Sequence, residues 1–317
     1  MISRRGHGRR RFAIAGAASV LAWALTACGG GASVPAQRPA PPQTPTPTHL
    51  GAFTSPPWTF STSSYWIEGP TGLILIDSQF TPSEAEKFLA KAEAETHKKA
   101  VLAIILHANP DKFNGTGVFQ KRGIKVVTSS QVRALIPEVF KIRTAAFGER
   151  YAPDWPTETP MPESFGSEST TLEAGGVNVR AHVMGAGCGE AHVVVEWEKS
   201  VFVGDLVAQA NHSWLEIGKT DEWLERLKEI DALKPRLVHP GRGTPGGPEL
   251  ISKEMKYLND VIRMVGEERP TMPIPAGALD RVATKIVALY PDYGFAVFLN
   301  IGLPAEWQRQ AKLTRKT

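Results

Sequence analysis

The residues of this sequence that are best suited to chemistry follow one apolar run. Residues 101–106 have the length and composition of a buried β-strand. His107, Asn109 and Asp111 come directly after them on alternate positions, and Lys112 follows Asp111. In α/β proteins, polar side chains at the carboxyl end of a buried strand usually form the functional site. We therefore expect the chemistry of this protein at the end of that strand.

Four segments resemble, in the same order, the motifs of the metallo-β-lactamase superfamily. They are residues 73–77, residues 107–115, Gly185-Ala186-Gly187-Cys188 together with Val203-Gly204-Asp205, and Pro240-Gly241-Arg242-Gly243. The resemblance covers most of residues 60–245 and implies an α/β fold, the four-layer αββα sandwich, with a metal site at one edge between its two sheets. Members of the superfamily typically hold one or two zinc ions and use a metal-activated water to hydrolyse lactams, thioesters, phosphoesters or lactones.

Carried over by position, the resemblance implies candidate ligands for two metal ions. The first ion would be held by His107, Asn109 and Cys188, and the second by Asp111, a bridging Asp205 and Arg242, which replaces a histidine. A thiolate is a good zinc ligand, whereas an amide oxygen is a poor one. A guanidinium cannot bind a metal, because it is always protonated and has no acceptor atom. The normal site for the second ion is therefore excluded.

Arg242 and Lys112 suggest what has replaced the second ion. They would put two positive charges beside Asp111 and Asp205, and carboxylates grouped in a site need such compensation. The sequence thus predicts a site converted from metal-held to salt-bridge-held, with Asp111, Lys112 and Arg242 as candidate catalytic residues. The expected cofactor is one zinc ion, or none if the site is converted.

Each candidate also has a purely structural interpretation. His107 can be a hydrogen-bonded histidine at a strand end, and Asp111 and Asp205 can bond backbone amides in turns. Cys188 can be a small buried apolar side chain. His192 lies at none of the family's ligand positions, so we expect it in the core or on the surface.

The elements that must position these residues alternate between strands and helices, which favours an α/β arrangement. Residues 65–77 predict a hairpin around Gly69-Pro70-Thr71-Gly72. Thr81, followed by a proline and then by Glu84, is typical of a helix start. We predict four regions: a signal peptide of the lipoprotein type at 1–27, a Pro/Thr/Gly-rich tether at 28–57, a metallo-β-lactamase-like domain at 58–248, and a helical C-terminal extension of the same domain at 249–317.

The beginning of the chain indicates export. A basic start precedes an apolar segment, residues 13–25, and Leu25-Thr26-Ala27-Cys28 resembles a bacterial lipobox. In that motif Cys28 is lipidated, so we expect a periplasm-facing lipoprotein of the cell envelope that is attached to a membrane through Cys28. The Arg-Arg-x-Phe pattern also resembles a twin-arginine signal, and both export routes stay open.

The net charge of +4 comes from this leader. Five of the 36 basic residues and none of the acidic ones lie in residues 1–27, which leaves 31 basic and 32 acidic residues. A nearly neutral remainder without a basic tract gives no electrostatic footprint for nucleic acid, so we expect no such partner.

Three functions are compatible with these residues. The first is a pseudoenzyme that binds a small molecule, expected to be anionic, or an envelope partner. The second is a hydrolase of esters, thioesters or lactones with a single zinc on His107, Cys188 and Asp111 or Asp205. The third uses Cys188 as a nucleophile and His107 as its base.

Overall fold

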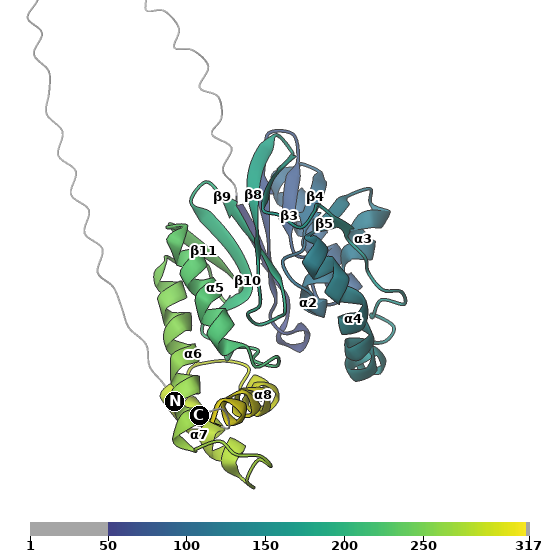
Figure 1. Cartoon of the computed structure of the whole chain (residues 1–317). Coiled ribbons are helices and arrows are strands. Elements are labelled where there is room, and N and C mark those ends of the chain that lie inside the picture. Colours follow the sequence, from purple (N-terminus) through teal and green to yellow (C-terminus); the bar gives the residue numbers. More distant parts are fainter. Residues whose placement is uncertain (1–49, 315–317) are drawn as a thin grey trace, which may run out of the picture. The chain divides into compact units, whose positions relative to one another are not determined.

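The structure, a computed structural model, describes residues 50–314, and its folded part consists of two β-sheets packed face to face. The first sheet has the strand order β1-β2-β3-β4-β5-β6, and the second has the order β11-β10-β9-β8-β7. Helices α1 to α4 lie on the first sheet, whereas α5 and α6 lie on the second (Figure 1). The predicted αββα sandwich is confirmed.

The strands alternate with helices in each half of the chain. Those of the first sheet are β1 (Leu50–Thr54), β2 (Ser63–Glu68), β3 (Leu73–Ile76), β4 (Ala100–Ile104), β5 (Lys125–Thr128) and β6 (Glu163–Ser164). Those of the second are β7 (Thr170–Ala174), β8 (Val177–Met184), β9 (His192–Trp197), β10 (Ser200–Ala208) and β11 (Leu237–Arg242). The helices are α1 (Pro82–Thr96), α2 (Pro110–Phe113), α3 (Thr116–Lys121), α4 (Ser130–Tyr151), α5 (Thr220–Ala232), α6 (Glu249–Glu267), α7 (Ala278–Leu289) and α8 (Val297–Thr314), with a short 3-10 helix at Pro57–Thr59.

Parallel pairing brings the ends of distant strands to one edge. Strands β3, β4 and β5 are parallel neighbours, and β10 is parallel to β11. The predicted hairpin is present as the antiparallel pair β2–β3. The side chain of Thr81 caps α1 by accepting a hydrogen bond from the Glu84 N–H, as expected. At the start of α5, in contrast, Thr220 lies inside the helix and its hydroxyl donates to Glu306.

Two apolar layers hold the fold together. The larger one lies between the sheets and beneath α1 to α4, and it includes Trp66, Phe88 and Phe202. The other lies between the second sheet and α5 to α8, and Trp223 and Trp307 are buried in it. No helix within residues 50–314 has the length and apolar character needed to cross a membrane.

Strand β1 lies inside the range 28–57, for which the sequence predicted a tether. Residues Leu50–Thr54 pair with β2, and Gly51 lies against the indole of Trp66, where a Cβ would be 1.8 Å from a ring atom. The fold therefore extends at least to Leu50, ahead of the predicted start at Trp58. The predicted signal peptide, Cys28 and the remaining tether lie outside the described residues.

Candidate functional site

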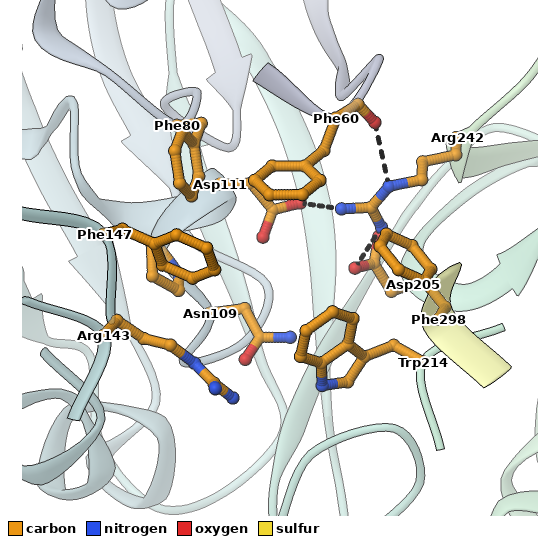
Figure 2. A pocket seen from close by; sticks show the side chains of 11 residues that line it. Phe60, Phe80, Asn109, Asp111, Arg143, Phe147, Asp205, Trp214, Arg242 and Phe298 are labelled. Carbon is orange, nitrogen blue, oxygen red and sulfur yellow. Dashed lines mark hydrogen bonds and ion pairs between the residues drawn. The ribbon is translucent and has the colours of Figure 1, made fainter. Parts of the chain in front are cut away.

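Four buried charged side chains meet at the edge of the sandwich. Lys112 Nζ lies 3.0 Å from Asp111 Oδ2 and 2.8 Å from Asp205 Oδ1. Arg242 Nη2 lies 2.7 Å from Asp111 Oδ2, and its Nη1 lies 2.5 Å from Asp205 Oδ2 (Figure 2). None of the four residues is more than 5% exposed. These are the ion pairs that the sequence predicted, and we call them the ion-pair group.

Backbone geometry allows these side chains to approach. Asp205 follows a bulge in β10, where Gly204 adopts a left-handed φ of 54°. Gly241 in β11 touches Asp205 so closely that a Cβ there would lie 2.1 Å from Asp205 Oδ1. The next residue, Arg242, is held in place because its Nε donates to the carbonyl of Phe60 at 3.0 Å.

The charges of this group compensate one another. Burial by itself would raise the pKa of Asp205, but Arg242 and Lys112 outweigh burial and hold that pKa below its ordinary value. A third carboxyl, Asp77, has its pKa raised to about 8 by burial, and its Oδ1 accepts a hydrogen bond from the Leu106 N–H at 2.9 Å. At neutral pH two carboxylates thus face two cations, and Asp77 is mainly neutral.

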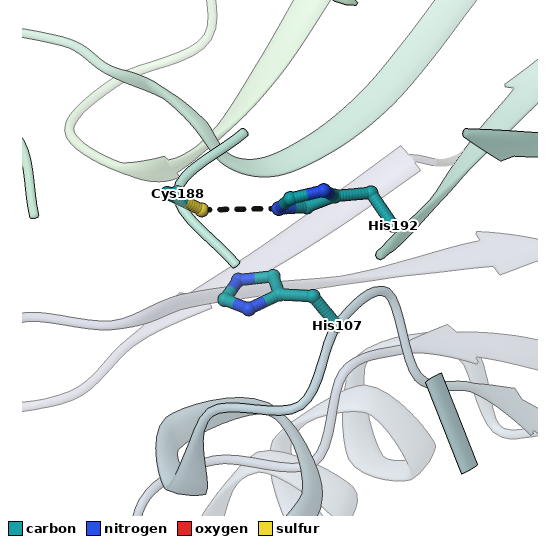
Figure 3. A group of neighbouring side chains, drawn as sticks. All are labelled: His107, Cys188 and His192. Carbon is teal, nitrogen blue, oxygen red and sulfur yellow. Dashed lines mark hydrogen bonds between the residues drawn. The ribbon is translucent and has the colours of Figure 1, made fainter. Parts of the chain in front are cut away.

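A second group lies beside the first and consists of His107, Cys188 and His192. Their ligand-capable atoms all lie within 4.8 Å of one another, so the group could hold a metal ion (Figure 3). Cys188 Sγ is 3.2 Å from His192 Nε2, and His192 Nδ1 lies 2.9 Å from the carbonyl of Gly185. Neither ring nitrogen of His107 has a hydrogen-bond partner in the described part of the chain.

Burial keeps this second group uncharged. It lowers the pKa of His107 to about 3 and that of His192 to about 4. It also raises the pKa of the Cys188 thiol, which therefore lacks the thiolate character of a reactive nucleophile. Cys188 contacts His192 rather than the predicted base His107.

His192, which we expected in the core or on the surface, is buried, and it is also a member of this second group. It is the first residue of β9 and pairs with His107 across an isolated β-bridge. The signal in the sequence was the four-residue spacing between Cys188 and His192, with a glycine after the cysteine.

A small aromatic pocket opens next to the ion-pair group, and Asp111, Asp205 and Arg242 form part of its wall. Its five aromatic side chains are Phe60, Phe80, Phe147, Trp214 and Phe298 (Figure 2). Asn109 and Arg143 line the same pocket, and they also line a neighbouring cavity of about 310 Å³ that reaches Cys188.

The family model of the metallo-β-lactamase superfamily matches residues 57–242, more than half of the chain. The chain belongs to this superfamily. A solved structure of the metallo-β-lactamase DIM-1, exposed to ceftazidime, matches with a TM-score of 0.52 and 15% identity over 66% of this chain and 91% of that one. A metallo-β-lactamase from Pontibacter korlensis matches with a TM-score of 0.49 and 19% identity over 67% and 93%. No curated protein matches the sequence.

The residues at this site are suitable ligands for the first of the two zinc ions of a metallo-β-lactamase, but not for the second. The second ion would need the carboxylates that Lys112 and Arg242 now hold. For the first ion, imidazole and thiolate are suitable zinc donors, and the unpartnered buried nitrogens of His107 leave room for such a bond.

Proposed function

We propose that this chain binds a small molecule in the aromatic pocket and does not carry out two-metal hydrolysis. One observation carries the second half of this proposal: the guanidinium of Arg242 pairs with both carboxylates that would hold the second ion. Without that ion, the paired metals that clamp an attacking and a leaving oxygen are missing.

The residues that line the pocket indicate what kind of small molecule it would bind. Five aromatic rings favour a flat, largely apolar body. Among the described residues, Thr62 and Arg242 donate hydrogen bonds to Asp111, and both bonds go to Oδ2. Oδ1 is therefore left to accept a hydrogen bond from a ligand. Because the ion-pair group is balanced in charge, and Arg143 already pairs with Glu216, the pocket selects an anion less strongly than the sequence suggested.

Two fluorescent probes test this proposal on the full chain. Anilinonaphthalene sulfonate is anionic and N-phenylnaphthylamine is uncharged, so comparing them separates apolar recognition from charge recognition. We expect both to bind saturably. Trp214→Ala should weaken binding roughly fivefold, because a lost aromatic contact costs about 1 kcal/mol.

The control is Trp58→Ala, since Trp58 is 51% exposed and lies outside the pocket lining. Equal losses in both variants, or no saturable binding, would contradict the pocket assignment. With zinc supplied, we also expect no turnover of a chromogenic lactam, ester, thioester or lactone. Turnover that disappears in Asp205→Asn would show that the hydrolytic site is intact.

The second candidate function is hydrolysis with a single zinc ion, and the His107, Cys188 and His192 group favours it. Asp111 and Asp205 are less suitable as ligands than the sequence suggested, because both are paired with cations. This candidate predicts zinc-dependent turnover that is lost in Cys188→Ser and retained in Trp214→Ala.

For the location we propose a lipoprotein of the cell envelope, on the basis of the lipobox before Cys28. Cys28→Ala should move the protein from the membrane fraction to the soluble fraction. Mass spectrometry of the wild-type N-terminal peptide should show an acylated cysteine. A protein that remains membrane-bound after the substitution, with an unmodified wild-type N-terminus, would refute this location.

A further inference from the structure

The three residues of the His/Cys group come from different parts of the chain and converge on one point. His107 follows β4, Cys188 lies in the loop between β8 and β9, and His192 begins β9 (Figure 3). All three are at most 2% exposed. We infer that this chain binds one zinc-type metal ion through His107, Cys188 and His192, a ligand set in which His192 takes the place that the family pattern gives to Asn109.

The distances are close to those of a metal site. With zinc–nitrogen bonds of about 2.0–2.1 Å and zinc–sulfur bonds of about 2.3 Å in a tetrahedron, a sulfur and a nitrogen ligand lie about 3.5 Å apart. The distance from Cys188 Sγ to His192 Nε2 is 3.2 Å, and the three ligand-capable atoms span no more than 4.8 Å. Small side-chain rotations would complete the arrangement.

Each histidine can offer a nitrogen lone pair to a metal ion. The Nδ1–H of His192 donates to the carbonyl of Gly185 at 2.9 Å, so the lone pair of Nε2 faces Cys188. There it accepts a 3.3 Å hydrogen bond from the Gly189 N–H, which a metal ion would displace. A metal-bound histidine typically makes this kind of bond with its other nitrogen. His107 is fully buried, and its two nitrogens lack hydrogen-bond partners within residues 50–314, which is costly unless another group binds there.

The other candidate ligands lie beside the His/Cys group. Asn109 lines the aromatic pocket near Trp214 (Figure 2) and also the cavity that reaches Cys188. Both oxygens of Asp205 lie against the two cations of the ion-pair group, and its Oδ2 is 3.7 Å from His107 Nε2. Asp205 is therefore a neighbour of His107 whose oxygens are already paired. The cavity of about 310 Å³ reaches Cys188 and gives an ion a path to the site.

The test measures binding of zinc and cobalt to the full chain. Metal content is determined by mass spectrometry after equilibration with buffered zinc, and cobalt is titrated while its absorption spectrum is followed. We expect one ion per chain and a sulfur-to-cobalt charge-transfer band that is absent in Cys188→Ser. Loss of a residue that only hydrogen-bonds to a metal ligand typically lowers metal affinity 10- to 100-fold. His192→Ala should lower zinc affinity by more than this, because it removes a ligand.

Asn109→Ala is the matched control, because it removes the family's ligand position and should leave zinc affinity unchanged. Loss of zinc in Asn109→Ala with retention in His192→Ala would overturn the inference, and so would a wild-type chain that binds no ion.

X-ray absorption of the wild-type zinc complex keeps the test valid if a variant does not fold. One sulfur and two imidazoles are expected, whereas a single imidazole would contradict the set. Probe binding in the aromatic pocket is a separate readout, so the two proposals can fail independently.

Discussion

Arg242 and Lys112 are the residues that define the edge of this sandwich, because they keep two buried carboxylates ionised. Each cation touches both Asp111 and Asp205, so no single pair can be removed without disturbing the others. Buried pairs of this kind stabilise little relative to apolar residues, but breaking one leaves an uncompensated charge. The group is therefore sensitive to single substitutions.

Arg242→Met should lower the free energy of unfolding by about 3–5 kcal/mol, because the two carboxylates would share only Lys112. Chemical denaturation followed by circular dichroism measures this. The control is Arg281→Met, which breaks a solvent-exposed pair with Glu268 and should have a much smaller effect. Similar losses in both variants would mean that the ion-pair group is not the stabilising unit.

Glu254 should make stability depend on pH. It is fully buried, accepts hydrogen bonds from the Ala208 N–H and the Ser213 hydroxyl, and has its pKa raised to about 7 by burial. Because the folded state holds this proton more tightly than the unfolded state, stability should fall as pH rises from about 4.5 to 7, by roughly 3 kcal/mol, and then level off. The charge of Asp205 raises this pKa further, Tyr257 and Tyr293 are close enough for Glu254 to raise their own pKa values, and Lys253 lines the same pocket.

The measurement is a set of denaturation curves between pH 4 and 8 for the wild type and Glu254→Gln, in which Gln cannot titrate. The difference in unfolding free energy between the two proteins should change across this range in favour of the variant as pH rises. A difference that stays constant with pH would show that Glu254 does not titrate there.

At this scale the sequence predicted charges better than contacts. We predicted the ion pairs of Lys112 and Arg242 with Asp111 and Asp205 from the family positions and from the need to balance buried carboxylates. The role of His192 could not be predicted in the same way. It depends on a bridge to a residue 85 positions earlier in the chain, and only the packing of the two sheets brings them together.

At the scale of elements, the site depends on how closely β10 and β11 approach. Gly241 is the point of closest contact, since a Cβ there would lie 2.1 Å from Asp205 Oδ1 and 2.7 Å from the carbonyl carbon of Gly204. These neighbours are a buried ion-paired side chain and backbone, so neither can move freely. The two strands therefore set the position of the ion-pair group.

Gly241→Ala should destabilise the protein by about 1–3 kcal/mol, the usual cost of overpacking a core, and it should also displace Arg242. The control is Gly117→Ala in α3, where an added Cβ meets nothing within 4 Å and should stabilise by roughly 0.5–1 kcal/mol. Thermal unfolding of both variants is the measurement. If Gly241→Ala is as stable as the wild type, the strands are not in contact as described.

Prediction of elements from the sequence succeeded where local signals are strong. The β2–β3 hairpin and the Thr81 cap have turn and capping residues that act within a few positions. Strand β1 has no such signal, because its five residues follow a proline-rich tract and gain their order from pairing with β2. Likewise, the aromatic pocket combines Phe60, Phe147 and Phe298, which lie far apart in the sequence.

At the scale of the whole molecule, the folded unit extends beyond the segment that matches the family model. That match ends at residue 242, whereas the second apolar layer continues through α6, α7 and α8. Leu299, Leu303 and Trp307 of α8 are almost completely buried in it. The sandwich and these helices belong to one compact unit.

A chain that ends at Pro248 should therefore fail to fold cooperatively, because it would expose the apolar face that α6 to α8 cover. Size-exclusion chromatography and thermal circular dichroism should show aggregation and a broad transition. A chain that ends at Lys312 is the control, since Leu313 is 50% exposed. A soluble, cooperatively unfolding product from the shorter chain would make the helices a separate domain.

The ion-pair group also has a consequence for the conditions under which this edge can assemble. In a dinuclear relative, the carboxylates are organised by ions that must be acquired from the surroundings. Here the compensating charges are encoded in the chain as Lys112 and Arg242, so they are present from the moment of synthesis. The aromatic pocket beside them should therefore keep its shape during zinc starvation and in the presence of a chelator. Either condition would disable a dinuclear hydrolase of the same fold.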